Sequence, residues 1–93
     1  MQEIFDAFAG RSAGDGVVGV EEQGDHDLVW FSKQVRRDFY RRLGIAHIRR
    51  DGDTYKVAWL HGPDDHPSEE VEYGDLHELN LAGWKAIWAR ATE

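Results

Sequence analysis

The sequence predicts a mainly β (α+β) domain of about five antiparallel strands, in which short helices flank a small barrel. Two segments repeat one pattern: an apolar strand, a Gly-Asp turn at Gly24 or Gly52, and a second strand containing a Trp. Each copy is typical of a β-hairpin, and the hairpins are expected at residues 17–32 and 45–61. The length of 93 residues fits a single domain with one modest core.

The chain begins with a predicted short helix over residues 2–9. Ile4, Phe5 and Phe8 share one face of this helix, and Gly10 stands where a C-terminal cap belongs. We expect the helix to cover one end of the barrel, which takes up residues 17–79.

Residues 33–43, between the two hairpins, are predicted to form an amphipathic helix inserted in the barrel. Apolar residues recur at every fourth position, at Val35, Phe39 and Leu43, and Gly44 is placed to end the helix. The remaining positions are rich in Arg, so the outer face is basic. Replacement of Phe39 by Asp would then be expected to unfold the domain.

Three further elements follow the second hairpin. Residues 61–67 contain both prolines and read as a loop, and residues 69–73 alternate polar and apolar side chains as a half-exposed strand does. A C-terminal helix is expected over residues 80–92, where Trp84 and Ile87 belong to an apolar set at helical spacing. Both tryptophans of the repeat, Trp30 and Trp59, are predicted to be core partners across the barrel.

The charge is uneven along the chain, and the net charge is −7. Residues 33–50 contain seven basic residues and one acidic residue, whereas residues 61–80 contain seven carboxylates and no Lys or Arg. Such charges often neutralise one another across a fold or face solvent. The alternative is a bipolar surface that attracts a charged partner.

The composition argues against several kinds of chemistry. The absence of Cys excludes disulfides and thiolate chemistry. Neither a nucleophile motif nor a phosphate-binding loop is present, so we expect no enzyme and no cofactor. His61, His66 and His77 with nearby carboxylates are a metal candidate, but their spacing matches no recurrent zinc pattern and no metal is expected. An acidic N-terminus and no long apolar run predict a cytoplasmic protein without membrane contact.

One part of the chain resembles a protein family. The run Asp51-Gly52-Asp53-Thr54-Tyr55-Lys56-Val57-Ala58-Trp59, followed by Val71-Glu72-Tyr73-Gly74-Asp75-Leu76, is similar to the middle of Tudor and other SH3-like barrel domains. The resemblance covers residues 44–79 and implies an SH3-like or Tudor-like barrel. It also implies an aromatic cage for a methylated cation, formed by Tyr55, Trp59 and Tyr73. The alternative is that these rings belong to the core.

These observations lead to three hypotheses on function. The first is a non-catalytic protein-binding module with a charged bipolar surface. The second is an acidic inhibitor that imitates nucleic-acid charge and occupies a nucleic-acid-binding enzyme; the chain is similar in composition to phage anti-restriction and anti-CRISPR proteins. The third, which the acidity of the domain disfavours, is direct binding of nucleic acid through the Arg-rich helix.

The hypotheses use different residues. The acidic candidates for protein binding are Asp64, Asp65, Glu69, Glu70, Glu72 and Asp75. The basic candidates for protein or nucleic-acid binding are Arg36, Arg37, Arg41 and Arg42.

Overall fold

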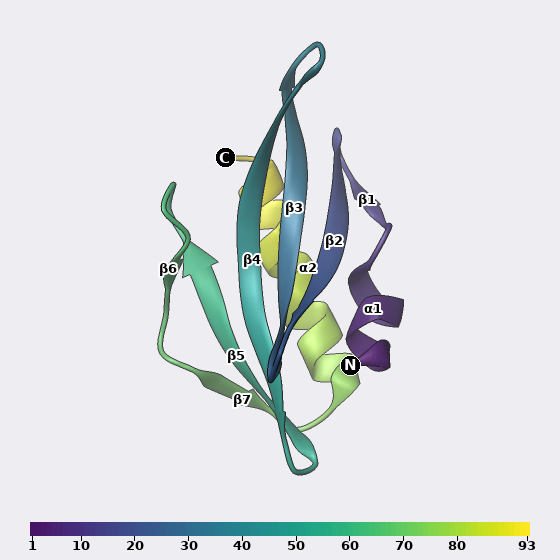
Figure 1. Cartoon of the computed structure of the whole chain (residues 1–93), viewed down its shortest axis with the longest axis vertical. Coiled ribbons are helices and arrows are strands. Elements are labelled where there is room, and N and C mark those ends of the chain that lie inside the picture. The colour runs from purple at the N-terminus through teal and green to yellow at the C-terminus, as the bar shows by residue number, and fades with distance from the viewer.

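One antiparallel sheet with two helices packed against it forms the structure (Figure 1). The structure is a computed structural model that describes residues 1–93. The elements in chain order are α1 Gln2–Phe8, β1 Ser12–Ala13, β2 Gly16–Gln23, β3 His26–Arg36, β4 Phe39–Asp51, β5 Thr54–His61, β6 His66–Pro67, β7 Val71–Tyr73 and α2 Leu76–Ala91. Neither helix is both long and apolar enough to cross a membrane.

The sheet is open, so the predicted closed barrel is not confirmed. Its strands follow the order β1-β2-β3-β4-β5-β6, and β7 pairs with a second part of β5. No pairing joins β1 or β2 to β5, β6 or β7, which closure would require. The mainly β class is confirmed, with more strands than the five expected.

Both predicted hairpins are present. β2 and β3 pair from Val17↔Ser32 to Gln23↔His26, and β4 and β5 pair from Ala46↔Trp59 to Asp51↔Thr54. Gly24 and Gly52 lie in the turns with φ of 76° and 62°, a backbone region that glycine adopts without steric cost. The Gly-Asp turns therefore located both hairpins correctly.

The predicted helix over residues 33–43 is wrong, because this segment forms the far ends of β3 and β4. Arg37 and Asp38 make the turn between the strands, and Asp38 has a left-handed φ of 61°. A spacing of four residues also fits a strand, since an even spacing returns to the same face. Of the three apolar residues assigned to the helix face, only Leu43 is buried, whereas Val35 and Phe39 are exposed.

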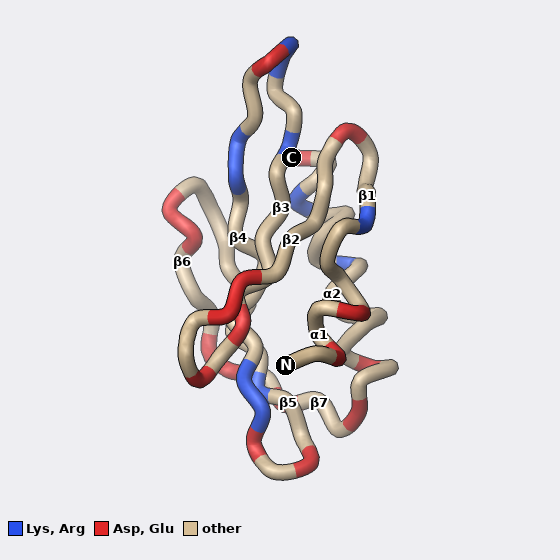
Figure 2. Tube along the Cα trace, turned by 45° about the vertical axis from the view of Figure 1, so that its right-hand side comes forward, with Lys and Arg blue, Asp and Glu red and all other residues tan.

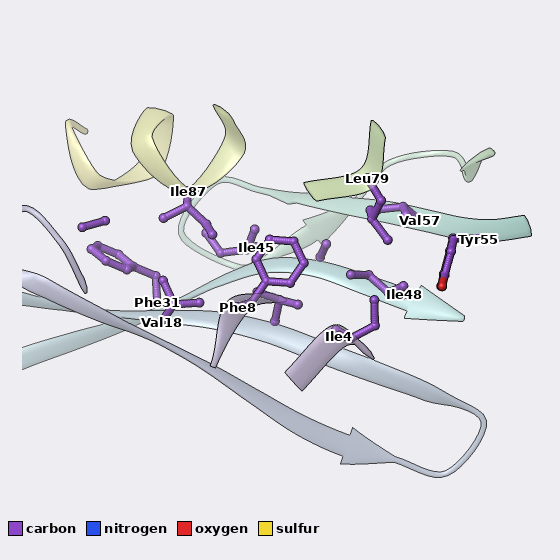
Figure 3. Close-up of a cluster of buried hydrophobic side chains, with 13 residues drawn as sticks. Ile4, Phe8, Val18, Phe31, Ile45, Ile48, Tyr55, Val57, Leu79 and Ile87 are labelled. Carbon is purple, nitrogen blue, oxygen red and sulfur yellow. The ribbon is translucent and has the colours of Figure 1, made fainter. Parts of the chain in front are cut away.

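Both helices pack on the same side of the curved sheet and enclose the core side chains against it (Figure 3). Ile4 and Phe8 of α1 share one core cluster with Leu79 and Ile87 of α2, and all four are fully buried. The sheet contributes to the same cluster Val18, Val29, Phe31, Ile45, Ile48, Tyr55 and Val57.

The structure refines the bounds of both terminal helices. The N-terminal helix is confirmed over Gln2–Phe8. The C-terminal helix begins at Leu76, four residues earlier than predicted, because the carboxylate of Asp75 caps it by accepting the Glu78 N–H at 2.8 Å.

The expected pairing of two core tryptophans is also wrong. Trp30 lies between buried Val29 and Phe31, so its side chain is on the outer face of the sheet, where it covers Gly19. Trp59 shares the inner face with Tyr55 and packs against the core. The two indoles therefore lie on opposite faces of the sheet.

Gly83 of α2 is expected to resist substitution. Alanine in place of glycine usually stabilises a helix by about 1 kcal/mol. Here a Cβ would lie 2.5 Å from Cζ of Phe8, so Gly83→Ala is expected to lower the free energy of unfolding by roughly 1–3 kcal/mol. In a Phe8→Leu background, which removes the clashing ring carbons, the same change should be neutral or stabilising. Thermal melting of the four proteins measures this coupling, and a higher Tm for Gly83→Ala alone would contradict it.

Candidate functional site

The far part of the β3–β4 hairpin projects beyond the rest of the sheet and forms the candidate site (Figure 1). Ser32 is the last residue of β3 that pairs with β2, and Ala46 is the first residue of β4 that pairs with β5. Residues 33–42 are therefore a two-stranded ribbon without neighbouring strands, here called the basic arm. Residues 1–32 and 43–93 are called the body.

The arm exposes large apolar side chains. Val35, Phe39 and Tyr40 have exposed fractions of 55%, 52% and 59%. An isolated two-stranded ribbon gains little stability in water. Exposed apolar rings on such a ribbon are typical of a surface that contacts another molecule.

The arm also carries cations that the body does not neutralise (Figure 2). None of the ion pairs of the structure includes Arg36, Arg37 or Arg41. Arg36 lies over the ring of Phe39 at 5.1 Å. Arg42 is different, because it contacts Glu21 of the body at 2.9 Å and lies over Trp30 at 4.6 Å.

A hollow of about 320 Å³ lies where the arm meets the body. It is lined by Lys33, Gln34, Val35, Arg41, Leu43 and Glu93. Lys33 and Arg41 are directly opposite each other in the ladder, an arrangement of like charges that destabilises a strand pair. The Lys33 ammonium donates to the main-chain oxygen of Glu93, whereas Arg41 has no anionic partner. An anion placed here would relieve the repulsion.

Most of the acidic candidates are engaged within the body. Glu70 accepts two hydrogen bonds from Arg49, at 2.7 and 2.8 Å, and Glu72 contacts Lys56 at 3.0 Å. The hydrogen bond from Arg49 lowers the pKa of Glu70, and that from Lys56 lowers the pKa of Glu72.

Two further acidic candidates have structural partners. Asp65 contacts Arg90 at 3.1 Å, and Asp75 caps α2. Asp64 and Glu69 make no ion pair. Two of the six acidic candidates are therefore unpaired, compared with three of the four basic candidates.

The three predicted cage residues lie together on the inner face. Tyr55 pairs with Tyr73 across β5 and β7, and the rings of Trp59 and Tyr73 meet edge to face at 6.2 Å. Tyr55 is 6% exposed and belongs to the core cluster. This placement fits the alternative in which the rings contribute to the core.

The histidines do not assemble a metal centre. His61 and His66 are partners across β5 and β6, and no group of three or more His, Cys, Asp or Glu side chains is placed to hold a metal ion.

Sequence reasoning missed a different pair, His26 and His47, whose rings meet edge to face at 4.8 Å. Burial, and then the charge of His26, lower the pKa of His47. The two histidines are far apart in the sequence, and the pairing of β3 with β4 brings them together. For this reason no sequence motif marks the pair.

Comparison of the chain with protein-family models, with curated proteins and with solved structures found no match. The resemblance to Tudor and SH3-like domains stays a prediction.

Proposed function

We propose that the protein is a non-catalytic protein-binding module and that the basic arm is its main contact site. The observation that carries the proposal is the combination of three unpaired arginines and three exposed apolar side chains on one projecting ribbon. Arginine and aromatic residues are enriched in protein interfaces, where they contribute much of the binding energy.

The charge distribution favours a protein over a nucleic acid as the partner. The arm has five basic residues and one acidic residue, and the body has six basic and seventeen acidic residues, which gives +4 and −11. A nucleic acid is negative along its whole length, so the body would oppose its binding. A protein can present an acidic surface to the arm and a basic surface to the body.

The arm is long enough to act separately from the body. At the rise of a strand, the chain from Gly44 to Phe39 spans roughly 17 Å. Charges are screened over about 8–10 Å at physiological salt. The end of the arm therefore attracts an acidic surface despite the negative body.

The acidic-inhibitor hypothesis has weaker support. Asp65, Glu70, Glu72 and Asp75 already bind groups of the same chain, and a mimic of nucleic-acid charge needs carboxylates that are free to meet a basic channel. The net charge of the body still allows a basic partner, such as a nucleic-acid-binding enzyme, to lie against it. In that arrangement the arm and the body would contact different parts of one partner.

Site-specific photo-cross-linking in the cells that encode the protein tests the proposal. Benzoylphenylalanine replaces Phe39 on the arm or, as the control, Trp88, which is 49% exposed on α2. The Phe39 probe is expected to capture a defined protein that the Trp88 probe does not capture. A nuclease-sensitive product would support the nucleic-acid hypothesis instead. Capture only from a probe at Glu69 would support the acidic inhibitor.

Two triple variants with the same net charge show whether the arm itself matters. The first is Arg36→Ala with Arg37→Ala and Arg41→Ala. The second removes three exposed cations of the body, Arg11, Arg50 and Lys85. We expect the arm variant to slow association with the captured protein about tenfold, and the body variant to have little effect. Equal effects of the two variants would contradict a specific role of the arm.

A further inference from the structure

The outer edge of β4 has unpaired backbone groups on the arm. The Gly44 N–H donates to the Asp65 carboxylate at 2.9 Å, and the Gly44 carbonyl accepts from Arg90. Both groups therefore point away from β3. In an antiparallel ladder the backbone groups alternate between the two sides, so those of Arg42 and Tyr40 point to the same outer edge.

The body covers this edge only as far as Gly44. From Leu43 toward Tyr40, neither Asp65 nor Arg90 covers the edge. The pairing of β4 with β5 begins only at Ala46 and runs in the other direction, to Asp51. Uncovered N–H and C=O groups at a sheet edge can accept an added strand.

The chain itself contains a strand of matching chemistry on a neighbouring edge. β7 is a short acidic strand that pairs with β5 at three positions. Glu72 contacts Lys56 at 3.0 Å, and Glu70 just before β7 contacts Arg49 at 2.7 Å. An edge strand whose Glu72 meets Lys56 of the neighbouring strand is thus an arrangement that this fold already uses.

We infer that an extended acidic segment of the partner protein adds as an antiparallel strand to the outer edge of β4 at Tyr40–Arg42. This inference rests on the proposed function and names the part of the partner that the arm recognises. The charge of β4 selects the segment, because Arg41 lies directly opposite Lys33 of β3 and has no anionic partner.

The register predicts which residues the segment carries. Its residue opposite Arg41 lies on the face of the hollow, next to Arg41 and one strand further from Lys33, and is expected to be Asp or Glu. Its neighbours in sequence lie opposite Tyr40 and Arg42, on the face of Tyr40 and Trp30, and are expected to be apolar. The N–H groups of these apolar residues bond to β4, whereas the N–H of the acidic residue points away from it.

A synthetic peptide tests whether the N–H groups of the apolar residues, and not those of the acidic residues, bond to β4. The probe is acetyl-Thr-Glu-Val-Glu-Val-Glu-Thr-amide, and its affinity is measured by fluorescence anisotropy. N-methylation of both valines removes the donors to β4 and is expected to weaken binding roughly tenfold or more. N-methylation of two glutamates keeps these donors, so the affinity should change by less than about threefold. Replacement of all Glu by Gln should also weaken binding.

Two variants of the protein locate the peptide on the arm. Tyr40→Pro removes the outward N–H and the phenol but keeps the pairing with β3, as an edge position allows. Tyr40→Ala removes the phenol alone. The proline variant should bind the peptide more weakly than the alanine variant, and circular dichroism confirms that both are folded.

The outcomes separate this inference from the proposed function. Equal affinities for the two N-methylated peptides, or no binding of the unmodified peptide, would exclude strand addition. Capture of a protein by the Phe39 probe would then still support the proposed function. If the Phe39 probe captures no protein, both the proposed function and the strand-addition inference are excluded.

Discussion

Replacing Arg90 by alanine is expected to lower the free energy of unfolding by about 3–5 kcal/mol. The residue is 5% exposed near the end of α2. Its guanidinium donates to the carbonyls of Gly44, Leu60 and Gly62 and to the Asp65 carboxylate, the last at 3.1 Å. Removal of this one group leaves buried acceptors of two strands and a loop without a donor.

Two control variants define what Arg90 contributes. Arg49→Ala breaks an exposed ion pair with Glu70, and pairs of that kind contribute about 1 kcal/mol or less. Arg90→Lys keeps the charge but loses the planar fork that reaches several acceptors, so it should remain strongly destabilised. Denaturant unfolding gives all three values. If Arg90→Ala and Arg49→Ala are equally stable, the buried guanidinium does not hold the base of the arm.

The hairpins could be predicted because their turns depend on local backbone chemistry. Glycine at Gly24 and Gly52 supplies a positive φ, and apolar strands flank each turn. The arm could not be assigned in the same way. Val35, Phe39 and Leu43 fit both a helix and a strand, and the turn at Asp38 uses a non-glycine residue with positive φ.

Closure of the sheet depends on packing that no local pattern describes. The repeat and the Trp positions suggested a barrel filled by its own side chains. Instead α1 and α2 fill the concave side through Phe8, Leu79 and Ile87, and the approach of α1 to α2 needs the missing side chain of Gly83. The helices therefore occupy the space that a closed barrel would enclose.

The candidate site was predictable in composition but not in shape. The sequence singled out the arginines of residues 36–42 and the carboxylates of residues 64–75. It could not reveal that Asp65 and Arg90, 25 positions apart, bind each other and cover the edge of β4 at Gly44. Such tertiary pairing engages Asp65 within the body, whereas Arg36, Arg37 and Arg41 of the arm stay unpaired.

Two phenylalanines on the same hairpin are expected to respond very differently to truncation. Phe31→Ala should lower the free energy of unfolding by about 3–5 kcal/mol, because its ring is 1% exposed and belongs to the core cluster. Phe39→Ala should change it by no more than about 0.5 kcal/mol, because the ring is 52% exposed on the arm. For the same reason Phe39→Asp should fold, which a buried helix face would forbid.

Thermal and urea unfolding of the three variants separate stability from binding. In the Phe39 variants we expect melting close to that of the parent together with weaker capture of the partner, because the exposed ring serves contact rather than packing. In Phe31→Ala any loss of binding should follow the loss of folded protein. If Phe39→Asp unfolds the domain, the ring packs in the core, and residues 33–42 do not form a free arm.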